Sequence, residues 1–266
     1  MRQAGKTIGF APTMGALHAG HTSLITQAKT ENDVVVCSIF VNPTQFNDKN
    51  DLAKYPRTTA ADINILTSAI CDVLFLPDET EVYPADFDYN FALDLGGLDL
   101  PMEGAKRPGH FKGVVQVVKR LLELVQPNTL YMGQKDFQQF AVCQRMIALT
   151  QLPIRIVRCP IIRESDGLAM SSRNVRLTTT GRAVSAKISA ILFEAQERAK
   201  TQPLKTVEAF AVEAYTAIPE FDLDYFEICD AKTLQKIASF EDATEVVACV
   251  VVKVDGVRLL DNVILK

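Results

Sequence analysis

Apolar residues in this chain gather in short runs that alternate with longer segments of helical periodicity. The runs at residues 33–41 and 73–76 are almost continuous, which is typical of parallel strands buried on both faces. Helical spacing places Leu24, Ile25 and Ala28 on one face of the segment after the first run. This alternation predicts a doubly wound (Rossmann-like) α/β parallel sheet. We expect strands at residues 7–11, 33–41, 73–76, 129–132 and 154–157, helices at 59–69, 114–125 and 137–150, and a further strand around 91–95.

The pattern changes in the last third of the chain. Two long helical patterns, at residues 178–201 and 205–218, precede alternating segments at 221–228, 245–254 and 257–260. Asp255-Gly256 lies between the last two segments and predicts a two-residue hairpin turn. We therefore expect a Rossmann-like domain at residues 1–161 and a smaller α+β domain at residues 162–266.

Composition narrows the function classes. The chain has 266 residues, is 48% hydrophobic and 23% charged, and carries a net charge of −4, as ordinary soluble globular proteins do. The acidic balance argues against a nucleic-acid partner, so any phosphate recognition is expected to be local. No apolar run is long enough to span a membrane, and the first residues do not resemble a signal peptide.

The six cysteines are widely spaced and do not form a C-x-x-C motif or a zinc-type cluster with histidine. Most have apolar neighbours, which favours buried, reduced thiols over a redox or metal role. This use of cysteine predicts a cytoplasmic protein.

Residues 12–21, in the N-terminal half, are candidates for phosphate binding and catalysis. Their sequence is Pro12-Thr13-Met14-Gly15-Ala16-Leu17-His18-Ala19-Gly20-His21. They lie between a predicted strand and a predicted helix, where backbone N–H groups and a helix dipole can bind phosphate. His18 and His21 are three residues apart and can donate hydrogen bonds to phosphate oxygens or transfer a proton. A surface turn with two ordinary histidines is the alternative, but only one other histidine, His110, occurs in the chain.

Three other polar stretches follow predicted strands. Asn42 and Gln45 lie at the carboxyl end of the second strand, where ligands bind in open α/β sheets. Lys135 precedes a helix N-terminus, which favours an anion there, whereas Asp136 and Gln139 could simply cap that helix. Ser171, Ser172 and Arg173 suit phosphate, but taken by themselves they are better explained by an exposed loop with a solvated arginine.

Taken together, these motifs resemble the H-x-G-H-type nucleotidyltransferases and, more closely, the pantothenate synthetase family. The resemblance rests on residues 12–21, 133–136 and 170–173, and also on 40–46, 55–57, 107–111, 136–139, 166–169 and 258–262. It runs from about residue 6 to the C-terminus. Two departures stand out: only residues 1–5 precede the first strand, where the family usually has a further helix, and residue 134 is Gln, where the family often has Glu.

The resemblance implies a set of site residues. His21 would be the proton donor, and His18 and Lys135 would contact the phosphates. Gln45 and Gln139 would hydrogen-bond pantoate or β-alanine in a pocket lined by Asn42, and Asp62 is a candidate Mg²⁺ ligand. The residues implied in ATP binding are Met14, Gly15, Ala16, Leu17, His18, Ala19, Gly20, His21, Gly133, Gln134, Lys135, Asp136, Ile162, Met170, Ser171, Ser172 and Arg173.

The implied reaction joins pantoate to β-alanine at the expense of ATP, with Mg²⁺ bound to the nucleotide. A carboxylate becomes a good acylating agent only after it forms a phosphoric anhydride, so a pantoyl adenylate would precede attack by the amine. The resemblance also implies that the second domain closes over the ATP site and that the protein is a homodimer.

Two other functions fit the same residues. A related cytidylyl- or adenylyltransferase would stop at a nucleotide-linked product without consuming an amine. A non-catalytic module would bind ATP without turnover, but the intact His, Lys and Ser-Ser-Arg sets argue against it.

Overall fold

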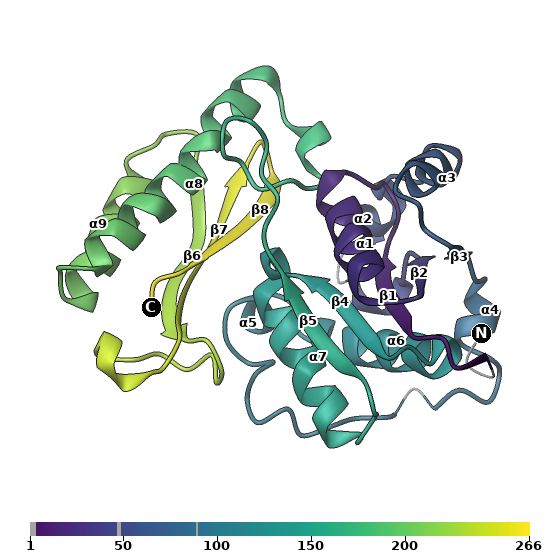
Figure 1. Ribbon diagram of the computed structural model, residues 1–266. Coiled ribbons are helices and arrows are strands. Elements are labelled where there is room, and N and C mark those ends of the chain that lie inside the picture. Colours follow the sequence, from purple (N-terminus) through teal and green to yellow (C-terminus); the bar gives the residue numbers. More distant parts are fainter. Residues whose placement is uncertain (1–3, 47–48, 89) are drawn as a thin grey trace. The chain divides into compact units, whose positions relative to one another are not determined.

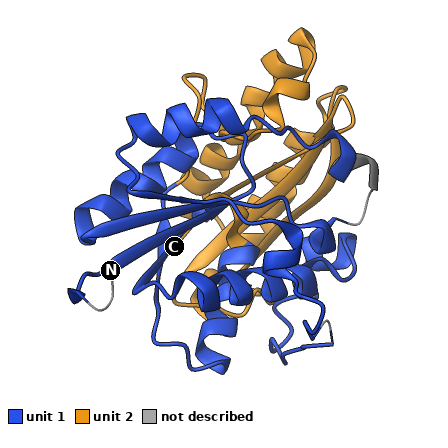
Figure 2. Cartoon of the chain, turned by 90° about the vertical axis from the view of Figure 1, so that its right-hand side faces the viewer, with its two compact units in different colours: residues 1–134, 138–160 blue, residues 135–137, 161–266 orange. Residues whose placement is uncertain are grey.

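The computed structural model describes residues 4–46, 49–88 and 90–266, and it contains two compact units (Figures 1 and 2). The first unit comprises residues 1–134 and 138–160, and the second comprises residues 135–137 and 161–266. Residues 135–137 thus belong to the second unit, although in sequence they lie between two segments of the first unit. Residues 47–50, a polar stretch of the sequence, lie partly outside the described residues.

A five-stranded parallel sheet forms the centre of the first unit. Its strands are β1 (Ile8–Thr13), β2 (Val34–Ile39), β3 (Val73–Phe75), β4 (Thr129–Gly133) and β5 (Arg155–Cys159). They lie in the order β3-β2-β1-β4-β5, and every neighbouring pair is parallel. The predicted doubly wound sheet is therefore confirmed. Because the strand order reverses at β1 and β4, the loops after these strands flank the topological switch point, where ligands bind in such sheets.

Four helices in the described part of the first unit lie where the apolar pattern predicts a helix, and three shorter ones were not predicted. They are α1 (Ala19–Glu31), α2 (Lys49–Lys54), α3 (Thr59–Ser68), α4 (Glu79–Val82), α5 (Glu103–Lys106), α6 (His110–Val125) and α7 (Phe137–Leu149), with 3₁₀ turns η2 (Pro43–Gln45) and η3 (Gln134–Asp136). In α1 the buried residues are Leu24, Ile25 and Ala28, as predicted. They pack with Val35 and Tyr131 into the core beneath the sheet.

Three expectations for the first unit are wrong in detail. Residues 91–95 do not form a strand, and they lie in an irregular segment. β3 is only half-buried and Leu76 is exposed, because β3 lies at the sheet edge and pairs only with β2. α6 begins at His110 rather than at residue 114, since Gly109 adopts a left-handed conformation (φ 80°) that starts the helix earlier.

The second unit packs two helices on an antiparallel sheet. α8 (Thr179–Ala199) and α9 (Leu204–Thr216) precede β6 (Asp222–Asp230), β7 (Val246–Val254) and β8 (Val257–Ile264), which lie in the order β6-β7-β8. The short turns are η4 (Asn174–Arg176) and η5 (Phe240–Asp242). Asp255 and Gly256 both have positive φ angles (52° and 74°), so the predicted two-residue hairpin turn is confirmed. Leu192, Val207, Tyr215 and Val252 are fully buried in the core of this unit.

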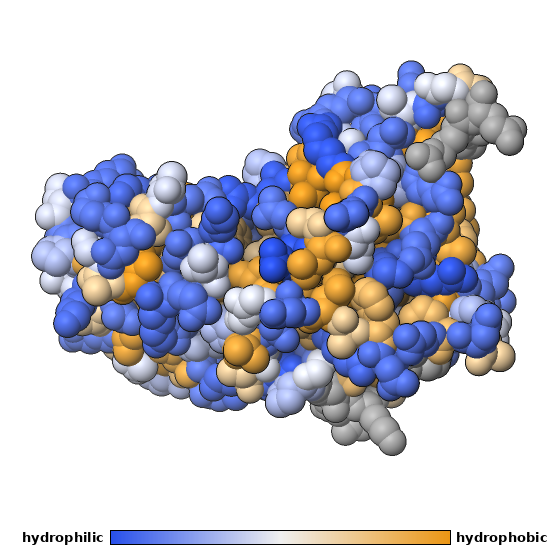
Figure 3. Space-filling view, turned by 90° about the horizontal axis from the view of Figure 1, so that it is seen from below, coloured by the Kyte–Doolittle hydropathy of each residue, from blue (hydrophilic) through white to orange (hydrophobic). Residues whose placement is uncertain are grey.

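The surface carries polar residues interspersed with apolar ones, as the space-filling view of one face shows (Figure 3). Large apolar side chains with high exposure include Ile70, Leu100 and Val175. Among the described residues, none of the helices has the length and apolar character needed to cross a membrane.

Candidate active site

The loop after β1 has a shape that a buried carboxylate holds in place. Gly15 and Ala16 both have positive φ angles (79° and 50°), so two successive N–H groups turn to the same side. Asp62 from α3 is 1% exposed and accepts hydrogen bonds from Ala16 N (3.0 Å) and Leu17 N (2.8 Å). The positive φ of Gly15 favours glycine, and an added Cβ would also lie only 3.1 Å from Asp62 Oδ2. Asp62 thus fixes the segment that leads to His18.

The two predicted histidines form the N-terminus of α1. His18 is the N-cap, and its Nδ1 accepts a hydrogen bond from Gly20 N (3.1 Å), while His21 Nδ1 accepts one from His18 N (3.2 Å). The two rings lie 4.1 Å apart between centroids. Because a neutral imidazole has one N–H, these bonds place the proton of each neutral ring on Nε2. The loop therefore presets both histidines to donate from Nε2.

Carboxylates are too sparse here to form a metal cage. In the parts of the chain that the structure describes, no group of three or more His, Cys, Asp or Glu side chains could hold a metal ion. Asp62 shares its carboxylate with two backbone N–H groups and with the Thr58 hydroxyl (3.2 Å). Asp62 is thus a single carboxylate that three protein donors already engage.

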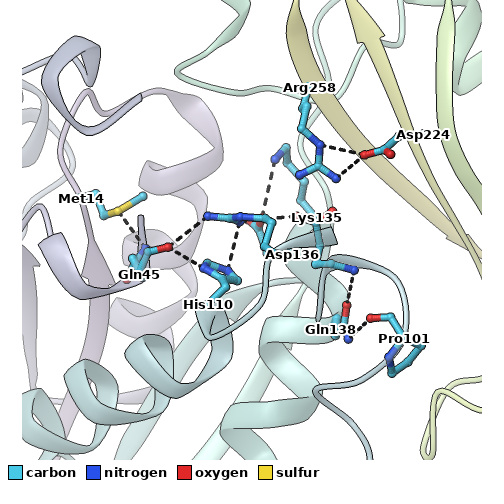
Figure 4. A network of polar contacts seen from close by, with 11 residues as sticks. Met14, Gln45, Pro101, His110, Lys135, Asp136, Gln138, Asp224 and Arg258 are labelled. Atoms are coloured by element: carbon cyan, nitrogen blue, oxygen red, sulfur yellow. Dashed lines mark hydrogen bonds and ion pairs between the residues drawn. The ribbon is translucent and has the colours of Figure 1, made fainter. Parts of the chain in front are cut away.

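Gln45 lies in a buried network at the end of β2 (Figure 4). Its Nε2 contacts Met14 Sδ (3.2 Å), and its Oε1 accepts a hydrogen bond from Asn42 Nδ2 (3.1 Å). Asn42 is 1% exposed, and its Oδ1 accepts from Tyr83 Oη (2.7 Å) and Thr44 Oγ1 (3.1 Å). The Asn42 amide is thus engaged by protein groups and orients Gln45 beside the loop after β1.

His110 and Arg107 hold the backbone of Gln45, a role that the sequence analysis did not assign. His110 Nδ1 lies 2.8 Å from Gln45 O, and Arg107 Nη2 donates to the same oxygen at 3.2 Å. Arg107 Nη1 lies 3.1 Å from His110 Nε2. Since the carbonyl only accepts and the guanidinium only donates, the neutral imidazole carries its proton on Nδ1. The motif at residues 107–111 was one of those that carry the family resemblance, but the sequence did not indicate this contact.

Gly113 is a second residue of this region whose role depends on tertiary structure. A Cβ at this position would lie 2.6 Å from Thr44 O and 2.9 Å from Gln45 N, closer than packing permits. α6 therefore approaches η2 at backbone distance, and only glycine fits.

The end of β4 leads directly into η3 and α7. Gly133, Gln134 and Gln139 are half-buried, whereas Gln138 is buried. Gln138 accepts a hydrogen bond from Glu103 N (3.0 Å) and donates to Leu98 O (2.9 Å) and Pro101 O (2.8 Å) (Figure 4). Gln138 thus anchors the preceding irregular loop, and Gln139 is the candidate for substrate contact.

Lys135 and Asp136 group with the second unit although they follow β4. Lys135 Nζ lies 3.9 Å from Asp136 Oδ1, and their side chains are 20% and 52% exposed. The backbone oxygen of Lys135 accepts a hydrogen bond from Asn262 Nδ2 (2.9 Å). Both side chains thus remain accessible while the backbone is held by β8.

The remaining predicted nucleotide residues lie on one loop of the second unit. Met170 N donates to Ile162 O (3.0 Å), which closes the loop between them. Ser171 Oγ accepts from Arg173 N (3.2 Å), and Asn174 N donates to Ser171 O (3.0 Å). Ile162, Met170, Ser171, Ser172 and Arg173 are half-buried.

None of the six cysteines forms a disulfide. Burial raises the pKa of Cys37, Cys143 and Cys229 to about 12 and that of Cys159 to about 11. Burial thus favours the protonated form of these four thiols at neutral pH, which disfavours a role as thiolate nucleophiles.

Known proteins resemble this chain over almost its whole length. The family profile described as Pantoate-beta-alanine ligase matches residues 1–264. Pantothenate synthetase from Porphyromonas gingivalis is 50% identical over 262 residues, which cover 98% of this chain and 92% of that protein. The Bacteroides fragilis enzyme of the same name is 48% identical over 263 residues, with coverage of 99% and 93%.

Solved structures agree with the sequence matches. The pantothenate synthetase of Thermus thermophilus superposes with a TM-score of 0.92 at 40% identity, covering 97% of this chain and 92% of that one. Pantoate-beta-alanine ligase from Francisella tularensis, complexed with beta-gamma ATP and beta-alanine, gives a TM-score of 0.76 at 38% identity, covering 97% and 90%. This chain belongs to the pantoate–β-alanine ligase family.

Proposed function

We propose that this protein is a pantothenate synthetase that ligates (R)-pantoate and β-alanine, with cleavage of ATP to AMP and pyrophosphate. Family membership over residues 1–264 carries this conclusion. A relative at 38% identity is described in complex with a form of ATP and with beta-alanine, which supports the same substrates for this chain.

The reaction has two steps. A pantoate carboxylate oxygen attacks the α-phosphorus of ATP, so an O–P bond forms and pyrophosphate leaves. The β-alanine amine then attacks the acyl carbon of the adenylate. An amide bond forms and the amine loses a proton, while AMP leaves with the oxygen that bridged the acyl carbon and the phosphorus. Positioning and charge stabilisation supply most of the catalysis, because neither step needs a covalent bond to the protein.

His21 is the proposed proton donor, with His18 beside it. Hydrogen bonds from the backbone to both Nδ1 atoms leave Nε2–H as the donor of each neutral ring. A donor fixed in this way stabilises charge that develops on phosphate oxygens as pyrophosphate leaves. The N-terminus of α1 adds a positive dipole at the same place.

Residues of both units are proposed to bind one ATP. In the first unit these are residues 14–21, Gly133 and Gln134. In the second unit, Lys135, Ser171, Ser172 and Arg173 would bind phosphates, Asp136 would bind the ribose, and Ile162 and Met170 would border adenine. The accessibility of Lys135 and the half-burial of residues 170–173 support these roles. A smaller domain that closes over ATP would exclude water from the adenylate.

Gln45 and Gln139 are the proposed pantoate ligands, and Asn42 lines their pocket by orienting Gln45. The buried Gln45 amide, oriented by Asn42 and with its backbone held by His110, would discriminate strongly against acids that lack the matching hydroxyls, because the amide would then be left unpaired.

Mg²⁺ is proposed to bind with ATP, with Asp62 as the candidate protein ligand. When bound, Mg²⁺ neutralises phosphate charge. A homodimer and a cytoplasmic location are further proposals: the family resemblance supports the first, and mostly buried cysteines that form no disulfide support the second.

Transfer of oxygen-18 tests the proposed function. Pantoate labelled in its carboxylate is incubated with ATP, Mg²⁺ and β-alanine, and the products are analysed by mass spectrometry. One labelled oxygen should appear in AMP and the other in the amide carbonyl. Label in pyrophosphate, or in inorganic phosphate released together with ADP, would contradict the adenylate route.

A further inference from the structure

β8 carries two adjacent polar residues that are almost completely buried. Asp261 is 3% exposed and Asn262 is 2% exposed, and they lie opposite Val250 and Cys249 of β7. Successive side chains of a strand point to opposite faces, so this pair can reach two different segments. Burying polar groups is costly unless each finds partners, and an apolar pair would serve a sheet core better. Their contacts indicate what the pair does.

Asp261 holds the loop that leads into residues 170–173. Its Oδ2 and Oδ1 accept hydrogen bonds from Arg163 Nη1 (2.6 Å) and Nη2 (2.9 Å) in a bidentate ion pair. Arg163 Nη1 also donates to Gly167 O (3.0 Å), and the guanidinium lies 4.8 Å from the Phe193 ring centroid. Arg163 and Ala169 form a β-bridge, so the ion pair fixes both sides of the turn immediately before Met170.

Asn262 holds the backbone of Lys135. Its Nδ2 donates to Lys135 O at 2.9 Å, although the two residues are 127 positions apart. Lys135 lies in the three-residue turn η3, which has few backbone bonds of its own to fix it. Residues 135–137 group with the second unit, to which Asn262 belongs. The carbonyl contact therefore sets where the Lys135 side chain begins.

We propose that Asp261 and Asn262 are positioning residues, which set the geometry of the two phosphate-binding segments of the second unit from one point on β8. This inference rests on the proposed function, because it is the ATP chemistry that gives Lys135 and residues 170–173 their roles. Neither side chain touches substrate in this account. They act through Arg163 and through the Lys135 backbone.

Asn262→Leu tests the contact of Asn262 with Lys135 O, because leucine keeps the branched shape of the side chain and removes the donor. We expect the kcat of pantoate-dependent pyrophosphate exchange to fall by roughly tenfold or more, since small displacements of a catalytic group are costly. Gln196→Leu is the matched control: Gln196 Nε2 donates to Ile264 O (2.7 Å), so the same kind of bond is lost two residues along β8. The control should lower the melting temperature without a comparable loss of kcat. Equal loss of kcat in both variants would overturn the proposal.

A double-mutant cycle separates positioning from general stability. If Asn262 acts through Lys135, Asn262→Leu should have no further effect on exchange in a Lys135→Ala background. Multiplicative losses would show that Asn262 acts elsewhere and would overturn the proposal. If Asn262→Leu does not fold, Asn262→Ser, which is too short to reach Lys135 O, takes its place in the same cycle.

Arg163→Lys tests the ion pair of Arg163 with Asp261, because lysine cannot form the bidentate pair. We expect a several-fold rise in the KM for ATP and an unchanged KM for pantoate. Unchanged KM values for both would overturn the role of Asp261. If the wild-type protein shows no exchange, the proposed function fails. If the wild type exchanges and the variants match it, only this inference fails.

Discussion

Ala16 and His18, in the loop after β1, are residues that local energetics disfavours at their positions. Ala16 has a φ of 50°, a left-handed conformation that costs roughly 1–2 kcal/mol for a residue with a Cβ. His18 is the N-cap of α1, where Ser, Thr, Asp or Asn is preferred. Asp62 stabilises the conformation of Ala16, and the hydrogen bonds from Gly20 N to His18 Nδ1 and from His18 N to His21 Nδ1 stabilise His18 as the N-cap. Such local costs are typical of functional sites.

His21→Ala should lower kcat by about two orders of magnitude or more, the usual scale for the loss of a positioned proton donor. The melting temperature should change little, because His21 lies at a helix end outside the core. Steady-state kinetics and thermal unfolding of the same preparation check both statements. A folded variant with normal kcat would contradict the assigned role.

Asp62→Asn should weaken ATP binding both with and without Mg²⁺. An amide can still accept one of the two loop N–H groups, but its NH₂ would face the other, so the loop loses its shape. Calorimetric titration with ATP, in Mg²⁺ and in EDTA, measures the effect. Thr58→Val, which removes only the hydroxyl contact to Asp62, is the milder control. A loss of affinity confined to Mg²⁺ would contradict the role of Asp62 in holding the loop and leave it only the proposed role of metal ligand.

At the scale of elements, the apolar pattern was sufficient to locate the strands and long helices. β2 is fully buried, as its β-branched run predicted, and Asp255-Gly256 forms the predicted turn. The start of α6 was misplaced, because Gly113 resembles a helix breaker in sequence, whereas in the structure it permits close packing on η2. The strand expected at residues 91–95 is absent, because a short apolar alternation without a pairing partner does not make a strand.

The candidate site likewise contains residues that the sequence could indicate and contacts that it could not. His18, His21, Gln45 and Lys135 stand in local motifs, so the sequence indicated them. The contacts of His110 to Gln45 and of Asn262 to Lys135 join residues 65 and 127 positions apart, and no local pattern encodes such a pair.

Gly113→Ala should impair pantoate use more than ATP binding. The added methyl would meet Thr44 O and Gln45 N, so η2 and the Gln45 side chain must shift. The KM for pantoate should rise severalfold in pyrophosphate exchange, while ATP affinity is retained. Val117→Ala, a buried truncation in the same helix, should lower stability and leave that KM unchanged. Equal pantoate KM values in the two variants would contradict this role of Gly113.

At the scale of the whole molecule, buried thiols make the free energy of unfolding depend on pH in the alkaline range. Burial raises the pKa of Cys143 from its ordinary value of 9.0 to about 12. A thiol whose pKa is raised on folding contributes stability that is fully present below pH 9.0 and is lost as pH rises toward 12. Between these limits, each such thiol steepens the decline by about 1.4 kcal/mol per pH unit.

Urea unfolding at several pH values tests this linkage. The free energy of unfolding of the wild type should fall above pH 9.0, and Cys143→Ala should decline less steeply despite its lower stability at neutral pH. Parallel declines in the two proteins would show that Cys143 does not titrate in this way.

The order of the chemical steps is the central claim, and isotope exchange tests it most directly. Labelled pyrophosphate should enter ATP when protein, Mg²⁺, ATP and pantoate are present without β-alanine, because the adenylate forms reversibly before the amine is needed. Exchange should be absent without pantoate, and added β-alanine should drain the intermediate to AMP and an amide. Exchange that requires β-alanine, or that proceeds without pantoate, would contradict the account.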